Sequence, residues 1–193
     1  MATHEQQKER ILEAALEVVY RETIVGTRMH LIAKEAGVVK SNIHYHFNTK
    51  KELLLALFTY TQKNYYMRER SLYEEASDLT LQEFIRQFFL QKKNFLLHYP
   101  KYDFVQFSFW TYAQIDEEIH KQFYQSYAEW QAHIAGLLRG CKPELSTIKA
   151  NMAAELTISL VMGGIMQYFN DQKNFDLDAY YEACTCAIQQ YLG

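Results

Sequence analysis

Breakers of regular structure are scarce in this chain. Its 193 residues include only 7 glycines and 2 prolines, which leaves few positions for tight turns. Between these positions, apolar residues recur every three or four residues, as they do on one face of an α-helix. No segment combines strand alternation with turn signals. We therefore predict an all-α fold of about nine helices.

Short helices are predicted at the start of the chain. A helix over 4–21 is followed by a short helix that Thr27 is placed to cap, and a third short helix covers about 39–45. Gly37 lies between the second and third helices, where a tight turn needs its backbone freedom. This helix, turn and helix have the spacing of a helix-turn-helix.

Longer helices follow and begin at recognisable signals. Thr80 and Glu83 have the spacing of a capping box at the start of one of them. Asp176 is placed to cap the last helix, and Pro143 suits the first turn of the helix before it. The domains expected are a helix-turn-helix domain over 1–47 and a larger helical domain over 48–193.

Positive charge is concentrated in the segment 27–51. The chain has a net charge of −3, yet this segment holds five cations and the single anion Glu35. A basic patch on an acidic protein is the expected footprint of a polyanion, although a solvated charged surface explains the charge alone. The five cations are Arg28, Lys34, Lys40, Lys50 and Lys51.

The third helix carries the side chains expected of a DNA-reading helix. Hydroxyl, amide and imidazole groups reach base edges, whereas lysines and backbone amides bind phosphate. Lys50 lies in the first turn of the next helix, where a cation is unfavourable beside the helix dipole unless a polyanion binds there. The polar residues of the third helix are Lys40, Ser41, Asn42, His44 and Tyr45.

One ordered set of residues runs from Ile11 to Leu53. It comprises Ile11-Leu12-x-Ala14-Ala15, then Thr27, then Ile32-Ala33-x-x-Ala36-Gly37-Val38, then Lys40-Ser41-x-Ile43-x-Tyr45-His46-Phe47-x-x-Lys50-x-x-Leu53. This set resembles the N-terminal domain of the tetracycline-repressor (TetR) family. The resemblance implies a homodimeric regulator that binds a palindromic operator in double-stranded DNA and an inducer in its C-terminal domain. The DNA contacts that it implies are Thr27, Arg28, Lys40, Ser41, Asn42, His44, Tyr45, His46 and Lys50.

The chain departs from the family pattern at three positions. Thr23 lies where the family usually has a glycine at the end of the first helix, so that helix is expected to end differently. Val39 replaces a common serine or threonine, and His44 replaces a frequent tyrosine. For His46, a phosphate contact and a structural role both remain open.

Aromatic residues are abundant in the second domain, and the whole chain contains 15 Tyr, 12 Phe and 2 Trp. Such residues at helical spacing are usually core, whereas the resemblance implies a cavity that would suit a mainly apolar or aromatic inducer. Both alternatives stay open for each ring. The predicted pocket residues are Phe88, Phe107, Trp110, Phe123, Tyr127 and Trp130.

Two adjacent glycines occur within the predicted helix before the last one. A glycine inside a helix costs about 1 kcal/mol relative to alanine, which indicates close approach of another helix. The resemblance implies a dimer built from the last two helices, although packing within the chain would explain the glycines equally. The predicted interface residues are Leu156, Leu160, Gly163, Gly164, Leu177, Tyr181 and Ile188.

No enzyme class is indicated. The sequence contains no glycine-rich phosphate loop, nucleophile elbow or His-Glu-x-x-His run, so we expect no catalytic residue, cofactor or metal. The polar N-terminus and the lack of about 18 uninterrupted apolar residues predict a cytoplasmic protein without a membrane partner. We therefore predict a ligand-responsive repressor. An activator on the same fold and a small-molecule-binding protein without a DNA target are the alternatives.

Overall fold

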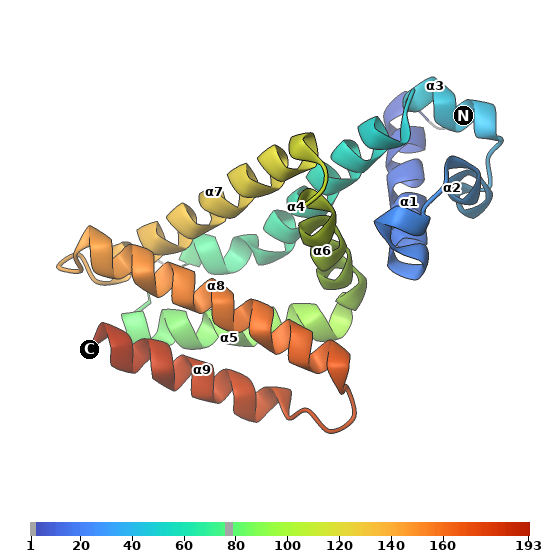
Figure 1. Cartoon of the computed structure of the whole chain (residues 1–193). Helices are drawn as coiled ribbons and strands as arrows, with labels where there is room; N and C mark the ends of the chain where they lie inside the picture. The colour runs from blue at the N-terminus through green and yellow to red at the C-terminus, as the bar shows by residue number, and fades with distance from the viewer. Residues whose placement is uncertain (1–2, 76–78) are drawn as a thin grey trace. The chain divides into compact units, whose positions relative to one another are not determined.

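The computed structural model describes residues 3–75 and 79–193, and nine α-helices without a strand make up this part of the chain (Figure 1). The all-α prediction is confirmed. The helices are α1 (His4–Gly26), α2 (Met29–Ala36), α3 (Lys40–His46), α4 (Lys50–Glu75), α5 (Leu81–His98), α6 (Pro100–Ala113), α7 (Glu117–Cys141), α8 (Thr147–Asn170) and α9 (Leu177–Leu192).

The chain forms two compact units, each built from two segments. The N-terminal unit comprises 1–67 and 100–124, and the C-terminal unit comprises 68–99 and 125–193. The unit that contains the helix-turn-helix therefore extends beyond residue 47, because it includes most of α4 and all of α6. Helices α4 and α7 each contribute to both units.

Helix α1 organises the N-terminal unit, since α2 and α6 both pack against it. Its apolar stripe, which includes Ala15, Val18 and Val19, is fully buried. The Tyr20 ring meets the Phe104 ring of α6 edge-on, with 5.1 Å between the centroids. The short helices of the helix-turn-helix are thus held by one long helix that also contacts α6.

The end of α1 departs from the prediction. The helix continues past residue 21 to Gly26, but it is kinked at Thr23, whose φ of 61° lies in the left-handed region. Together with its ψ of 171°, this is a conformation that glycine almost alone adopts, and it costs a residue with a Cβ about 1–3 kcal/mol, which explains why glycine suits the position. The first helix was expected to end differently because of Thr23, and the structure shows a strained kink at this residue within a longer helix.

Local start signals set the helices of the C-terminal unit. The Thr80 and Glu83 capping box is formed in both directions, and the Asp176 side chain accepts a 2.9 Å hydrogen bond from the Ala179 N–H. The prediction that Pro143 lies in the first turn of α8 is wrong. The helix begins at Thr147, because the Ser146 side chain caps it by accepting a hydrogen bond from the Lys149 N–H.

Helices α8 and α9 lie side by side in the C-terminal unit, and α9 also packs on α5 (Figure 1). A Cβ on Gly164 would lie 2.6 Å from Tyr180 Cε1 of α9, which is closer than packed atoms can approach. The Tyr180 hydroxyl donates a 2.8 Å hydrogen bond to the Leu160 carbonyl. The predicted close approach is therefore made within the chain.

Among the described helices, α8 alone is long and apolar enough to cross a membrane by length and composition. The same property occurs in the core helices of soluble proteins, so it is weak evidence for a span. One side of α8 is buried at every turn from Ala150 to Ile165, including Ala154, Ile158 and Val161. This pattern is that of a helix with one core-facing side.

Candidate nucleic-acid interface

The turn between α2 and α3 depends on Gly37. Its φ of 64° and ψ of 35° are left-handed, and its N–H closes α2 by donating to the Lys34 carbonyl at 3.1 Å. A Cβ there would also lie 3.0 Å from Arg10 Nη2. Below the turn, Ile32 and Ile43 are fully buried, so the two helices share one small core. The predicted helix-turn-helix is present.

The outer face of α3 is polar and uncovered within its unit. Tyr45 is 74% exposed, and Lys40, Ser41 and His44 are also exposed, whereas Asn42 is half-buried. Val39 is the N-cap residue and provides no side-chain hydrogen bond, as its aliphatic side chain predicted. Six of the predicted contact residues, including His46 at its end, thus lie on this seven-residue helix, whose packing face is marked by the buried Ile43.

Thr27 requires a correction. It is fully buried, and its hydroxyl donates a 2.6 Å hydrogen bond to the Thr23 carbonyl. Its N–H donates to the same carbonyl at 3.1 Å. The N-cap of α2 is Arg28, without a side-chain cap. Thr27 therefore closes the kinked end of α1 and presents no exposed hydroxyl to a phosphate.

Arg28 and Lys50 meet at the C-terminal end of α1. The Arg28 guanidinium donates to the Val25 carbonyl at 2.6 Å, and Lys50 Nζ donates to the Ile24 carbonyl at 2.6 Å. These carbonyls have no partner further along the helix, and cations are favourable there because of the helix dipole. Partial burial, followed by the charge of Arg28, lowers the pKa of Lys50.

The same two cations retain donors for an anion. A guanidinium has five N–H groups and an ammonium has three, whereas the helix end uses only some of them. A phosphate near Arg28 and Lys50 would also relieve the repulsion between their charges. The hydrogen bond to the Ile24 carbonyl at the end of α1 thus explains in part why a lysine lies at position 50. The remaining N–H groups of Lys50 are compatible with a phosphate contact.

Lys51 is neutralised within the N-terminal unit. Its Nζ lies 3.1 Å from Glu118 Oε2 and 3.2 Å from Asp116 Oδ1. Hydrogen bonds to these two carboxylates raise the pKa of Lys51. Its partners are more than 60 residues away in the sequence, so counting charges over 27–51 overstates the positive charge available there.

His46 belongs to a cluster of rings at the end of α3. Its ring lies 4.6 Å from the ring of His4 and 5.2 Å from that of Tyr45, measured between centroids. Both ring nitrogens are buried without a hydrogen-bond partner. Burial, followed by the charges of His4 and Lys8, lowers the pKa of His46. These contacts favour the structural role that the sequence left open.

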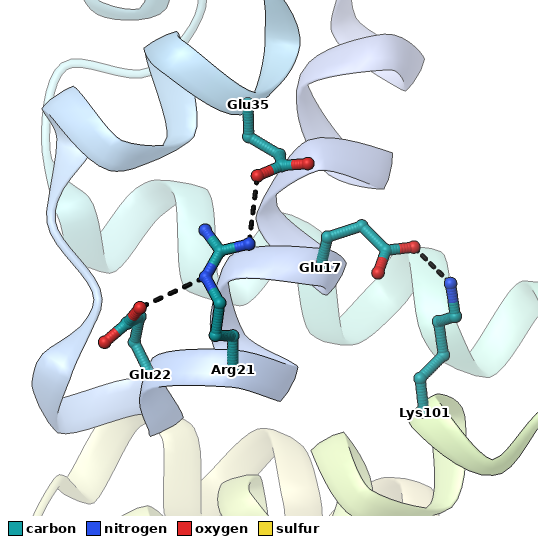
Figure 2. Close-up of polar contacts among 5 residues, drawn as sticks. All are labelled: Glu17, Arg21, Glu22, Glu35 and Lys101. Atoms are coloured by element: carbon teal, nitrogen blue, oxygen red, sulfur yellow. Dashed lines mark hydrogen bonds and ion pairs between the residues drawn. The ribbon is translucent and has the colours of Figure 1, made fainter.

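Several charged residues form ion pairs within the unit that could not be singled out from the sequence. Figure 2 shows Arg21 of α1 between Glu22 and Glu35, with both N to O distances at 3.1 Å. It also shows Glu17 of α1 paired with Lys101 of α6. Exposed charges at helical spacing predict a solvated face, and only the fold reveals which of them form links between helices.

The predicted pocket residues do not gather in one unit. Phe107, Trp110 and Phe123 belong to the N-terminal unit, whereas Phe88, Tyr127 and Trp130 belong to the C-terminal unit. Phe88 and Phe123 are buried, Trp110 is 51% exposed, and the other three are half-buried. The burial of Phe88 and Phe123 therefore favours a role in the hydrophobic core over a role in lining a ligand pocket.

The predicted interface residues divide into inner and outer groups. Leu177, Tyr181 and Ile188 of α9 are buried inside the C-terminal unit, as is Gly164 of α8. These four already pack within the chain, so their surface is not open to a second copy. The residues left partly or largely exposed on α8 are Leu156, Leu160 and Gly163.

The described residues contain no cluster of three or more His, Cys, Asp or Glu side chains that could hold a metal ion. Cys184 is buried and Cys186 is exposed, so the two do not face one another.

Comparison with known proteins places this geometry in a family. The family model of tetR-family bacterial regulatory proteins matches residues 11–57, and that of the BetI-type transcriptional repressor C-terminal domain matches 104–193. The transcriptional regulator SrpR of Pseudomonas putida is 36% identical over 61 residues, which are 32% of this chain and only 29% of SrpR.

Solved structures share the fold over nearly the whole chain. A transcriptional regulator from Pseudomonas aeruginosa PAO1 has a TM-score of 0.84 at 22% identity, covering 98% of this chain and 91% of that one. A regulator from Saccharomonospora viridis in complex with choline has a TM-score of 0.82 at 21% identity, covering 96% and 97%. Since the two family models together match more than half of its residues, the chain belongs to the tetR family of bacterial regulatory proteins.

Proposed function

We propose that this chain is a cytoplasmic transcriptional repressor that binds a palindromic operator as a homodimer and leaves it when a small molecule binds. The observation that carries the proposal is the exposed polar face of α3, held by Gly37 and flanked by Arg28 and Lys50. A helix of this kind enters the major groove, where its side chains meet base edges.

The α3 face supports a division of roles among its residues. Ser41, His44 and Tyr45 carry exposed polar or aromatic groups that reach bases, and Asn42 offers an amide at the edge of the face. Lys40 is an exposed cation at the start of α3, where phosphate binding is favourable. Arg28 and Lys50 supply further phosphate contacts from the end of α1.

The outer face of α8 supports the homodimer. Ile148 is 83% exposed, Met152 45%, Leu156 38% and Met166 58%, and these residues recur at helical spacing. An uncovered apolar stripe of this kind marks an interaction surface. Leu160 and Gly163 extend the same stripe, so we place the two-fold contact on this side of α8.

A palindromic operator follows from such a dimer. Two copies of α3 related by a two-fold axis would enter successive major grooves about 34–36 Å apart. A ligand that prefers a different dimer geometry would release the DNA through its difference in affinity for the two states. That a solved relative in fold is in complex with choline supports a small organic ligand for a chain of this architecture.

Selection from a pool of random double-stranded DNA tests the proposal. We expect the purified full chain to enrich one palindromic sequence, and Lys40→Ala to reduce enrichment at every position of it. Lys173→Ala, which removes an exposed lysine outside the helix-turn-helix, serves as the matched control. Failure to enrich any sequence would favour a small-molecule-binding protein without a DNA target. Raised transcription from a reporter bearing the enriched site would favour an activator.

A further inference from the structure

The N-terminal half of α1 places one cation at each end of α3. Lys8 Nζ lies 5.9 Å from the centroid of the Phe47 ring, and Phe47 is the residue that directly follows α3. At the other end, Arg10 Nη2 lies 3.0 Å from the point where a Cβ on Gly37 would stand, in the turn just before α3. All of these residues belong to the N-terminal unit.

The fold does not neutralise these two cations. Arg10 is exposed and Lys8 is half-buried. Among the described residues, neither has an ion-pair or hydrogen-bond partner, although Glu5 and Glu13 lie within one helical turn of them. The Glu13 carboxylate instead accepts a 3.4 Å hydrogen bond from the Tyr60 hydroxyl of α4. The charges of Lys8 and Arg10 are therefore available to an anion from outside the chain.

The C-terminal half of α1 provides the contrast. There Arg21 lies between Glu22 and Glu35, with both N to O distances at 3.1 Å, so two carboxylates balance its charge (Figure 2). Arg10 and Arg21 are thus the same residue type on one helix, one with its charge free and one with its charge paired. This difference makes Arg21 a matched control for Arg10.

We propose that Lys8 and Arg10 bind the backbone phosphates of DNA on either side of the groove that α3 enters. The seven residues of α3 span about 10 Å and the major groove is about 12 Å wide, so cations beyond both ends of the helix can reach the bordering backbones. Ammonium and guanidinium groups form charge-assisted hydrogen bonds with phosphate. The inference rests on the proposed function in that the anion is the DNA that α3 reads, and it adds two contacts from α1.

Contact with the Phe47 ring restrains the Lys8 ammonium, since a cation is attracted to the face of an aromatic ring. A side chain that is already restrained loses less conformational entropy when it binds. Phosphate contacts carry no base information, but they fix the position of the reading helix on the duplex. Loss of either cation should therefore weaken binding to all sequences alike.

The test measures fluorescence anisotropy of a labelled duplex of mixed sequence with the full chain, at several salt concentrations from about 50 to about 200 mM. Lys8→Met removes the charge and keeps most of the stem, and Arg10→Gln removes the charge from the turn. We expect each to weaken binding about tenfold near 100 mM salt and to reduce the salt slope by about 0.9 for each phosphate no longer contacted. Lys8→Arg and Arg10→Lys should retain most of the slope. Arg21→Gln, which removes the same charge from the same helix, should leave the slope unchanged.

An unchanged slope in both Lys8→Met and Arg10→Gln would overturn the inference, and an unchanged slope in one of them would overturn the contact of that residue. An equal fall in slope for Arg21→Gln would also overturn it, because only net charge would then matter. Unfolding followed by circular dichroism separates a packing role, since lower stability with an unchanged slope assigns the side chain to the fold.

Selection from the random DNA pool, run on the same proteins, keeps the two proposals apart. An enriched palindrome with unchanged slopes refutes the α1 contacts alone. Salt-sensitive binding that depends on Lys8 and Arg10, without any enriched sequence, refutes the proposed function alone. Absence of DNA binding under all of these conditions refutes both.

Discussion

Helices α3 and α8 each leave one face uncovered within their own unit, and the two faces have opposite chemistry. The α3 face presents Lys40, Ser41 and Tyr45, whereas the α8 face presents Ile148, Met152 and other apolar side chains. A polar, cationic face keeps its water until a polyanion displaces counterions. An apolar face lowers the free energy by leaving water altogether. The contrast supports the two partners that we propose, DNA for α3 and a second copy of the chain for α8.

The largest effect is expected from charge on the α8 face. Met152→Glu combined with Leu156→Glu places two carboxylates in the proposed dimer contact, where their desolvation and mutual repulsion oppose association. We expect the dimer dissociation constant to rise more than a hundredfold, an increase of about 2.8 kcal/mol in the free energy of association. Light scattering coupled to size-exclusion chromatography measures it. Leu90→Glu, at an exposed apolar residue of α5, is the control, and a dimer that tolerates the double variant would place the contact elsewhere.

Lys40→Ala on α3 should weaken DNA binding about tenfold for every sequence and reduce the salt slope by about one for each phosphate that the variant no longer neutralises. The physical reason is that fewer counterions are released from the DNA. Fluorescence anisotropy at several salt concentrations measures both quantities, with Lys173→Ala as the control. A changed base preference with an unchanged slope would instead assign Lys40 to a base.

Gly164 tests how closely the inner face of α8 packs on α9. Gly164→Ala puts a Cβ 2.6 Å from Tyr180 Cε1, and we expect the free energy of unfolding to fall by about 1–3 kcal/mol. Gly136→Ala, within α7 and with nothing within 4 Å of its added Cβ, should raise it by up to about 1 kcal/mol. Chemical denaturation compares the two, and equal stability of both variants would mean that α8 and α9 do not pack this closely.

The smallest effect concerns pH at the end of α3. Burial lowers the pKa of His46, so the folded chain keeps this ring neutral where the unfolded chain, with a pKa of about 6.5, already binds a proton. The unfolded state then binds more protons, and the free energy of unfolding should decrease as pH falls below about 6.5. His46→Leu should flatten this dependence and His120→Leu, at an exposed site, should not. If the free energy of unfolding of both variants depends on pH in the same way, groups other than His46 cause that dependence.

Features encoded by neighbouring residues could be predicted from the sequence. The Thr80 and Glu83 box, the Asp176 cap and the Gly37 turn each depend on a few consecutive positions, and all three are formed. The wrong prediction for Pro143 also relied on a local helix-start signal. Ser146, three residues later, is a second such signal, and it forms the actual cap of α8. Local signals thus define where helices begin, but they do not rank competing signals.

Roles that depend on distant contacts could not be predicted. Lys50 donates to a carbonyl 26 residues earlier, and Lys51 pairs with Asp116 and Glu118 of a helix start that only the fold brings near. Whether a ring lines a core or a ligand site also depends on packing, because periodicity shows only the side of the helix.

Recognition of DNA by the α3 face can be tested by comparing two duplexes. Fluorescence anisotropy of the full chain is recorded with the palindromic duplex enriched from the random pool and with a shuffled duplex, at about 50 and about 200 mM salt. We predict binding at least about a thousandfold tighter to the enriched duplex, weakening steeply with salt for both. Equal affinity for the two duplexes, or binding that does not respond to salt, would mean that the α3 face does not read DNA.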